Sequence, residues 1–293
     1  MSKESSGFLV PAGKQIKLKD YDTSYSGDLV KETGKAMMAE VKKRLASYQE
    51  VLYAGNTRSI LIIFQAMDAG GKDSAIRHVM SGLNPQGCQI FFFKTPSSNE
   101  YDHDFLWRHY LALPQRGRIG IHNRSHYENV LIAKVHPEYV LNERIPGYET
   151  VKDIDKEFWK TRLESIRNFE KHLTANGTLV LKFFLHVSED AQKKRFLNRI
   201  NDPTKNWKFS SSDISERSRW KQYMAAYEEA ISATSTADAP WYVIPADKKW
   251  FARLSISQVL EETFKSLNLQ YPELPEEENV LLEKYKKKLL AEV

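Results

Sequence analysis

Short apolar runs alternate with longer amphipathic segments along most of the chain. Five of these runs are rich in branched and aromatic residues and are bounded by turn residues, as buried strands are: residues 60–64, 88–93, 118–123, 179–186 and 241–244. Helical periodicity dominates the segments between them. Strands that alternate with helices form a parallel sheet covered on both faces. The pattern therefore predicts an α/β fold with three layers around a five-stranded parallel sheet.

The helices are expected at residues 29–54, about 73–81, 101–113, 128–141 with an interruption at Pro137, 151–175, 189–201, 214–232, 250–268 and 276–290. Asn56 follows the first and can end it, and Ser188 can cap the helix at 189–201. Asp213 and Glu216 have the spacing of a capping box for the helix at 214–232.

The same pattern divides the chain into three parts. Residues 1–28 show no period, and we expect them to form an arm lying over the surface. Residues 29–272 contain every predicted strand and form one domain. Residues 273–293 form a tail with a charged helix.

Composition narrows the class of protein. The 293 residues are 41% hydrophobic and 28% charged, which is ordinary for a globular domain. The chain contains no stretch of 18 apolar residues, so no transmembrane helix is predicted. The first residues lack the apolar core of a signal peptide. A single cysteine, Cys88, excludes an internal disulfide and a cysteine-rich metal site. We therefore expect a cytoplasmic location, and the net charge of +5 permits an anionic partner.

Candidate chemistry begins directly after the first strand, in the segment AMDAGGKDS. A strand, a glycine turn, a lysine and a helix form the layout of a phosphate-binding loop. The match to G-x-x-x-x-G-K-[ST] is imperfect, because Ala66 replaces the first glycine and Asp73 replaces the Ser or Thr. The alternative is a plain glycine turn with a solvated Lys72. We predict that phosphates are bound by Ala69, Gly70, Gly71, Lys72, Asp73, Ser74 and Arg77.

Three further residues suggest a metal site and a cationic side chain that stabilises the transition state. Asp68 lies within the loop, where a carboxylate would repel phosphate unless Mg²⁺ lay between them; its alternative role is an Asx turn. Asn123 ends the third strand, where phosphate-loop proteins often place an Asp that meets Mg²⁺. Arg124 beside it can bind two phosphate oxygens, although an exposed arginine in a surface ion pair is the commoner case.

A basic segment follows the fourth strand. Residues 193–221 hold nine basic and three acidic residues, an excess of six that is larger than the net charge of the whole chain. A solvated charged face is the simpler explanation. The position after the fourth strand and the break at Pro203 favour a helical lid over about residues 195–225, with Arg199, Lys205 and Lys208 toward phosphates. Lys94, in the loop after the second strand, and Glu128, after the third, complete the predicted binding residues.

Four segments together resemble the polyphosphate kinase 2 family: FQAMDAGGKDS, FKTPSSNE, LWRHYLALPQRGRIGIHNRSHYENVL and KKRFLNRINDPTKNWKFSSSDISERSRW. The resemblance extends from about Lys14 to Leu269, and SHYENVL and HPEY resemble the class III branch. Many members carry Asp at the position of Asn123. By motif, the family places Asp68 and Asn123 by the metal, and Lys72, Arg124, Arg199 and Lys208 toward phosphates.

The resemblance implies a thymidylate-kinase-like fold and reversible phosphoryl transfer from inorganic polyphosphate to ADP and AMP. It also implies Mg²⁺, for which Mn²⁺ can substitute, adenine or guanine nucleotides as acceptors, and a homodimer or homotetramer. The implied catalytic residues are Asp68, Lys72, Asn123, Arg124 and Arg199. An ATP-dependent nucleoside monophosphate kinase is the alternative enzyme. A nucleic-acid-binding protein is the alternative outside enzymes, but the chain has no recognised nucleic-acid motif, and we expect neither nucleic acid nor membrane as a partner.

Overall fold

A six-stranded sheet forms the centre of the molecule in a computed structural model that describes residues 7–292. The strand order is β1-β6-β5-β2-β4-β3. Five strands are parallel: β2 (Ser59–Gln65), β3 (Cys88–Phe92), β4 (Ile119–Asn123), β5 (Thr178–His186) and β6 (Trp241–Pro245). The prediction of five parallel strands is confirmed within two residues at each end. The predicted total is wrong, because a sixth strand, β1 (Leu9–Val10), pairs antiparallel with β6.

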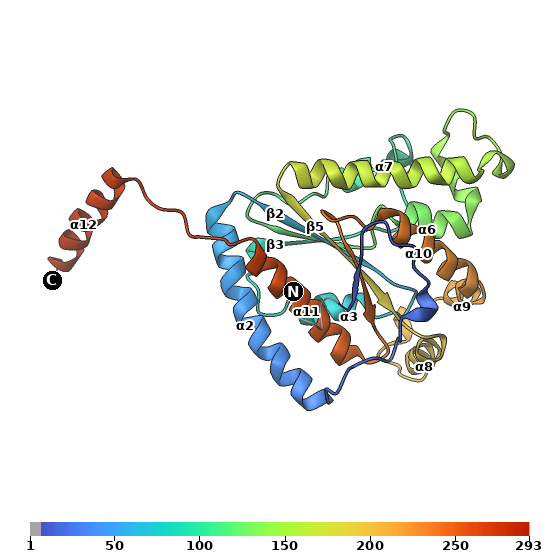
Figure 1. Cartoon of the computed structure of the whole chain (residues 1–293), viewed down its shortest axis with the longest axis horizontal. Helices are drawn as coiled ribbons and strands as arrows, with labels where there is room; N and C mark the ends of the chain where they lie inside the picture. Colours follow the sequence, from blue (N-terminus) through green and yellow to red (C-terminus); the bar gives the residue numbers. More distant parts are fainter. Residues whose placement is uncertain (1–6, 293) are drawn as a thin grey trace.

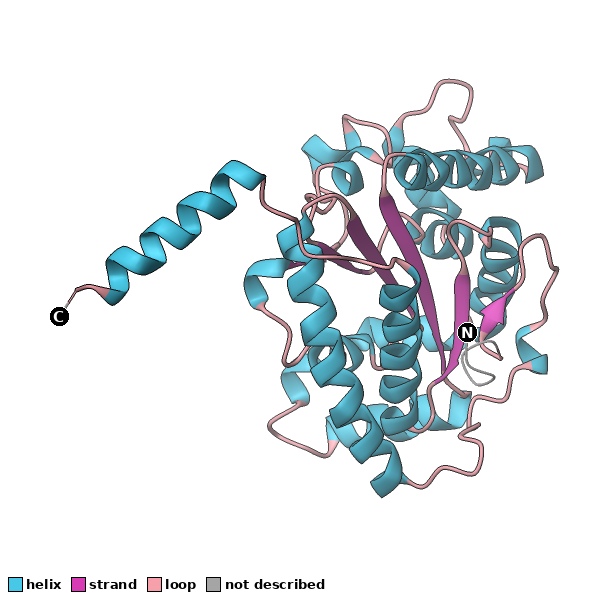
Figure 2. Cartoon of the chain, turned by 60° about the vertical axis from the view of Figure 1, so that its left-hand side comes forward, coloured by secondary structure: helices cyan, strands magenta, loops and turns pink. Residues whose placement is uncertain are grey.

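Helices cover both faces of the sheet (Figure 1). On one face lie α2 (Lys31–Gly55), α3 (Lys72–Val79) and α11 (Lys249–Ser266), which pack against one another. On the other lie α6 (Glu128–Val135), α7 (Lys156–Ala175) and α10 (Trp220–Thr234). A view turned by 60° shows the strands between these two groups of helices (Figure 2). The three-layer α/β prediction is therefore correct.

The central position of β2 places the glycine-rich loop. All seven residues of β2 are buried, because the strand pairs with β4 on one side and β5 on the other. Phe64 is in register with Asn123 of β4 and with Phe183 of β5. The segments after the three strands therefore leave the sheet at one edge, where α/β proteins form ligand sites.

The residues predicted to begin or end helices can be compared with the helix termini in the structure. Asn56 ends α2 in the left-handed conformation with φ 45°, and the Ser188 hydroxyl accepts from the Ala191 amide at the start of α8 (Glu189–Ile200), as expected. The predicted capping box of Asp213 and Glu216 is wrong. The box consists of Ser210 and Asp213, and it begins α9 (Ser211–Ser218) three residues earlier than predicted.

Three other expectations differ from the structure. The predicted helix at 214–232 is two helices, α9 and α10, because the chain leaves helical geometry at Arg219. The predicted helix at 101–113 is two single turns, α4 (Ser98–Tyr101) and α5 (Trp107–Tyr110). Part of the predicted surface arm is buried, with the side chains of Phe8, Val10, Ile16 and Leu18 in the core. Its first six residues lie outside the described part.

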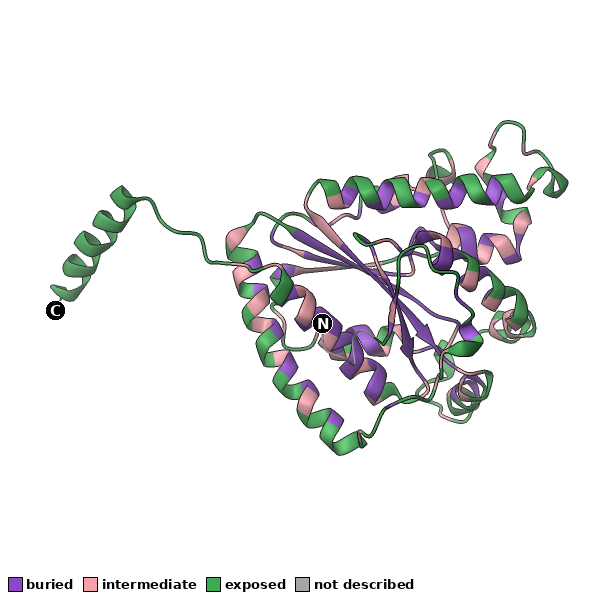
Figure 3. Cartoon of the chain, in the orientation of Figure 1, coloured by how far each residue is buried: buried purple, intermediate pink, exposed green. Residues whose placement is uncertain are grey.

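The remaining helices are short, apart from one in the tail. The 3₁₀ turns are Leu18–Asp20, Pro85–Gly87, Pro137–Glu143, Val151–Asp153 and Asn206–Lys208. The tail forms α12 (Glu276–Leu290), which projects from the body and buries none of its residues (Figure 3). Over residues 7–292, no helix is both long enough and apolar enough to cross a membrane.

Candidate active site

The glycine-rich loop, residues 66–71, turns sharply between β2 and α3. Gly71 has φ 102° and Ala69 has φ 57°, both in the left-handed region. A Cβ on Gly70 would lie 2.6 Å from the Ala66 Cβ and 2.6 Å from the Met67 carbonyl oxygen. Gly70 therefore has no room for a side chain, and Gly71 has a backbone conformation that other residues rarely adopt. These two glycines allow the loop to close over the start of α3.

Helix α8 holds the carbonyl groups of this loop. The Arg195 Nη1 donates to the carbonyl oxygens of Ala69 at 3.0 Å and Gly70 at 2.8 Å, and its Nη2 donates to those of Ala246 and Asp247. The Gln192 amide donates to the Asp68 carbonyl oxygen at 2.8 Å. Arg195 was predicted as part of the basic lid, but it is buried and fixed on the loop. The first amides of α3 remain as donors at the positive end of its dipole.

Lys72 is the first residue of α3 and lies within this turn. Its Nζ donates to the Ala66 carbonyl oxygen at 2.8 Å. Burial, together with the neighbouring Arg124 guanidinium, lowers the pKa of Lys72 from its ordinary value. The carboxylates of Asp68, Glu128 and Asp73 oppose this shift in the pKa of Lys72. Within the described residues the Lys72 Nζ donates to this carbonyl oxygen alone, so it retains donors for a bound anion.

Arg124 lies where three cavities meet. It adopts φ 65°, a strained conformation for a residue with a side chain, and its Nη2 lies 3.5 Å from the Asp68 carboxylate. The Glu128 carboxylate raises the pKa of Arg124, and Asp68 adds to that effect. The guanidinium lines cavities of about 700, 260 and 280 Å³. Groups bound in these cavities would therefore meet at Arg124.

The largest of these three, which we name the phosphate cavity, lies over the glycine-rich loop. Eight basic side chains line it against four carboxylates. The basic ones are Lys72, Arg77, Arg124, Arg195, Arg199, Lys205, Lys208 and Lys249, and the acidic ones are Asp68, Asp73, Asp202 and Asp213. Trp207 lies at the rim with 78% of its surface exposed. The excess of cations suits a polyanion.

The two smaller cavities have a different chemistry. The one of about 260 Å³, named the aromatic cavity, is lined by Phe93, Tyr101, Phe105 and Tyr139 together with polar groups that include Lys94, Arg108 and Glu128. The one of about 280 Å³ connects Asp68, Lys72 and Glu128 with Tyr223 and Tyr227 of α10. Most of the residues that line the aromatic cavity are polar or charged, and the four aromatic rings lie among them. Aromatic rings beside placed polar groups suit a small organic ligand that carries both apolar and polar parts.

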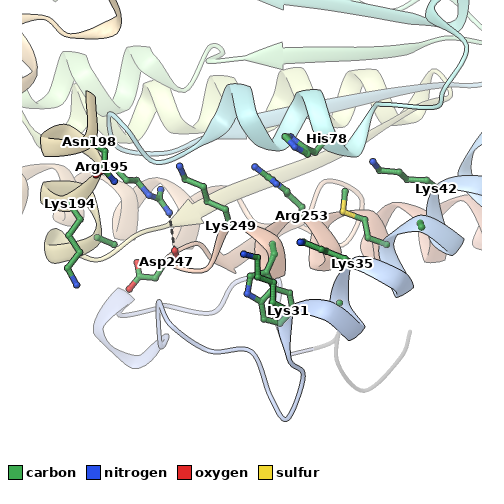
Figure 4. A pocket seen from close by; sticks show the side chains of 15 residues that line it. Lys31, Lys35, Lys42, His78, Lys194, Arg195, Asn198, Asp247, Lys249 and Arg253 are labelled. Carbon is green, nitrogen blue, oxygen red and sulfur yellow. Dashed lines mark hydrogen bonds between the residues drawn. The ribbon is translucent and has the colours of Figure 1, made fainter. Parts of the chain in front are cut away.

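A fourth cavity, of about 740 Å³, lies on the α2 and α11 side of the loop and is named the basic cavity (Figure 4). It shares Arg195, Asn198 and Lys249 with the phosphate cavity, so the two cavities adjoin. Its other cations are Lys31, Lys35, Lys42, Lys194 and Arg253, with His78 between them. The one carboxylate that lines it, Asp247, already accepts hydrogen bonds from Ser188 and Thr23.

Most of the predicted residues come together at this edge of the sheet. The phosphate cavity is lined by Asp68, Ala69, Gly70, Gly71, Lys72, Asp73, Ser74, Arg77, Arg124, Arg199, Lys205 and Lys208. Lys94 and Glu128 line the adjoining aromatic cavity instead. The sequence analysis missed Asn198, Trp207 and Lys249. Lys249 could have been found, because it follows a predicted strand at the same edge.

The residues predicted at the metal fit a cation only in part. Asn123 is 4% exposed, its Nδ2 donates to the Asp73 Oδ1 at 2.7 Å, and its own Oδ1 is buried without a hydrogen-bond partner among the described residues. Such an oxygen suits a cation or a water bound to one. Within residues 7–292 no group of three His, Cys, Asp or Glu side chains could hold a metal alone. A metal here would also need substrate oxygens, as Mg²⁺ commonly does.

A buried polar network lies behind the Arg124–Glu128 segment. The Lys182 Nζ forms an ion pair with Glu170 and donates to the Tyr127 hydroxyl at 3.0 Å and to the Thr234 carbonyl oxygen at 2.8 Å. The Tyr127 hydroxyl donates to the Glu170 carboxylate at 2.7 Å. The network ties the residue before Glu128 to β5, α7 and α10, and so fixes the segment that carries Arg124.

Comparisons with known proteins agree on one family. A model of polyphosphate kinase 2 matches residues 28–272. The chain is 51% identical over 274 residues to an ADP-polyphosphate phosphotransferase of Rhodopseudomonas palustris, covering 93% of this chain and 94% of that protein. It is 40% identical over 264 residues to an AMP/ADP-polyphosphate phosphotransferase of Meiothermus ruber, covering 90% and 93%.

A solved structure extends this agreement to the fold. The polyphosphate kinase 2 of Arthrobacter aurescens superposes with a TM-score of 0.84 at 38% identity, and the match covers 96% of each chain. The family match spans the five parallel strands, the glycine-rich loop and every cavity described above. This protein therefore belongs to the polyphosphate kinase 2 family.

Proposed function

We propose that this protein transfers phosphoryl groups from inorganic polyphosphate to ADP, forming ATP, and to AMP, forming ADP. The relatives that share 51% and 40% of its sequence are named for polyphosphate transfer to ADP and to AMP or ADP. The observation that carries the proposal is the position of Arg124. It lies between a cation-lined cavity suited to a phosphate chain and an aromatic cavity suited to a nucleoside.

In this proposal the nucleoside occupies the aromatic cavity and directs its phosphates toward Arg124. Polyphosphate occupies the phosphate cavity and brings its terminal phosphate to the same place. The acceptor oxygen of ADP or AMP is already anionic, so no strong general base is needed. Positioning and neutralisation of charge supply most of the rate enhancement.

Individual side chains have distinct roles. Lys72 and the first amides of α3 bind phosphate oxygens, and Arg124 and Arg199 stabilise the charge on the group in transfer. Asp68 and Asn123, with substrate oxygens, would hold Mg²⁺, or Mn²⁺ in its place. When bound there, the metal neutralises phosphate charge and orients donor and acceptor. Lys205, Lys208 and Trp207 lie in the proposed lid, residues 195–225, and would close over the phosphates.

The basic cavity would hold the distal phosphates of a long donor. Exchange of Lys31 and Lys35 for glutamine is therefore expected to raise the KM for long-chain polyphosphate several-fold and to flatten its salt dependence. The KM for tetraphosphate should not change, because a short donor does not reach these lysines. Initial rates measured with polyphosphates of different length, each at several salt concentrations, give these KM values.

A matched variant separates this local effect from net charge. Exchange of Lys43 and Lys171 for glutamine removes the same charge from exposed positions on α2 and α7. It should leave both KM values unchanged. Equal increases for long and short donors in the Lys31 and Lys35 variant would show that the basic cavity does not bind the chain.

A turnover assay tests the proposed function. The protein is incubated with Mg²⁺, long-chain polyphosphate and either ADP or AMP, and the nucleotides are then separated. We expect ATP from ADP and ADP from AMP. Formation of ADP from ATP plus AMP, with no use of polyphosphate, would establish a nucleoside monophosphate kinase in its place. A homodimer or homotetramer and a cytoplasmic location are also part of the proposal, and light scattering on the purified protein tests the first.

A further inference from the structure

The usual phosphate-loop site pairs two residues at the metal: a Ser or Thr directly after the loop lysine and an Asp at the end of a nearby strand. This chain has the opposite arrangement of charge. Asp73 follows Lys72, and Asn123 ends β4. These two positions still hold one carboxylate and one neutral side chain. The carboxylate, Asp73, lies on helix α3 instead of at the end of a strand.

The structure brings these two side chains together although 50 positions separate them. The Asn123 Nδ2 donates to the Asp73 Oδ1 at 2.7 Å. An ionised carboxylate only accepts hydrogen bonds, so the amide group must present its nitrogen to Asp73 and direct its oxygen elsewhere. That oxygen is the buried Oδ1 that has no partner in the described chain. The Asn123 Oδ1 therefore lacks a hydrogen-bond donor or a cation beside it.

Electrostatics favour a carboxylate at Asp73. It is the second residue of α3, where the helix dipole stabilises negative charge, and it lines the phosphate cavity. A carboxylate cannot donate a hydrogen bond to a phosphate, and it repels one through charge. Asp73 was predicted among the phosphate-binding residues, and its carboxylate can contribute to phosphate binding only when a cation lies between the two groups.

We propose that Asp73 is a metal-ligating carboxylate of this site, together with Asp68, and that Asn123 orients Asp73 and offers its Oδ1 to the metal or to a water bound to it. The carboxylate and its neutral partner have thus exchanged places between the helix and the strand. The inference rests on the proposed function, because a cation held by these residues would neutralise the phosphates of a bound nucleotide.

The test measures binding rather than turnover. Isothermal titration gives the affinity for ADP in the presence of Mn²⁺ and for ADP in the presence of EDTA, and the ratio of the two measures the contribution of the metal. Asp73→Asn keeps the size of the side chain and an acceptor for Asn123 but removes the charge. We expect it to reduce this ratio by about 10- to 100-fold, as loss of groups that support metal sites does, while binding of metal-free ADP is kept.

Two further variants make the result specific. Asp190→Asn removes an exposed carboxylate from the same second position of another helix, α8, and should leave the ratio unchanged. Asp73→Ser combined with Asn123→Asp restores the usual arrangement and should recover most of the ratio. Circular dichroism on each variant checks that its unfolding midpoint is preserved.

The outcomes are distinct. An unchanged ratio in Asp73→Asn overturns the inference and leaves the proposed function intact. A loss that the double variant does not recover also overturns it, because the two positions would then not have exchanged roles. A wild-type protein that binds no nucleotide under either condition would refute the proposed function, and the inference with it.

Discussion

Replacement of Lys72 by alanine is expected to lower kcat for phosphoryl transfer by at least about a hundredfold, the usual loss when one positioned donor is removed. The Nζ of Lys72 donates to the carbonyl oxygen of Ala66, while the carboxylates of Asp68, Glu128 and Asp73 act on it through space. It retains donors that can bind phosphate oxygens when substrates arrive. Steady-state rates with ADP and polyphosphate measure the effect.

The same variant should remain folded, because the lysine is not part of the apolar core. Lys171→Ala, on the exposed face of α7, is the matched loss of one positive charge and should keep the wild-type rate. Near-normal turnover in Lys72→Ala would mean that the glycine-rich loop does not bind the reacting phosphates.

Replacement of Lys182 by methionine is expected to destabilise the fold by about 3–5 kcal/mol, because it leaves the Glu170 carboxylate buried without its partner. The Lys182 side chain is 0% exposed and that of Glu170 is 1% exposed. The Tyr127 hydroxyl and the His126 Nε2, at 3.4 Å, would remain beside Glu170. The hydroxyl carries no charge, and burial lowers the pKa of His126, which favours its neutral form. Urea unfolding at neutral pH measures the change in the free energy of unfolding.

A double variant shows whether the loss arises from the unpaired charge. Lys182→Met with Glu170→Leu removes both charges from the core and should recover most of the stability, since apolar residues often replace a buried ion pair at little cost. A single variant as stable as the wild type would show that Glu170 is accommodated by other means. If the double variant is no more stable than the single variant, the loss of stability arises from packing and not from the unpaired charge.

The sequence predicted the parallel strands well, and it predicted that the candidate residues would gather at one edge of the sheet, for a physical reason. A run such as residues 60–64 is apolar on both faces only if helices cover both, so it indicates a central parallel strand. Residues that follow such strands gather at one edge of the sheet. Lys72 and Arg124 could therefore be assigned to one site before their distance was known.

Features that depend on tertiary contacts could not be predicted in the same way. Arg195 resembles its basic neighbours in sequence, but only the fold shows that its guanidinium is buried against four backbone carbonyl groups. The strand Leu9–Val10 is too short to show a period, and its pairing with β6 joins the N-terminal segment to the sheet. The contact of Asn123 with Asp73 likewise depends on the register of β2 and β4.

The local errors have local causes. Asp213 and Glu216 have capping-box spacing, but Ser210 and Asp213 have it too, and the structure uses the earlier pair. The predicted helix at 101–113 contains rings that contact other parts of the chain from single turns: His109 lies 4.2 Å from Phe93, and Tyr110 lies 6.4 Å from Phe169 of α7, between ring centres. Tertiary packing therefore decided this segment rather than helical periodicity.

The most direct test of the central claim follows one phosphoryl group from donor to acceptor. Polyphosphate labelled with ³²P is incubated with unlabelled ADP, Mg²⁺ and either the wild-type protein or Lys72→Ala, and the label in the γ-phosphate of ATP is counted. We predict that label enters ATP with the wild type at least about a hundredfold faster than with the variant. ATP that forms without label, by conversion of two ADP to ATP and AMP, would contradict the claim that polyphosphate is the donor.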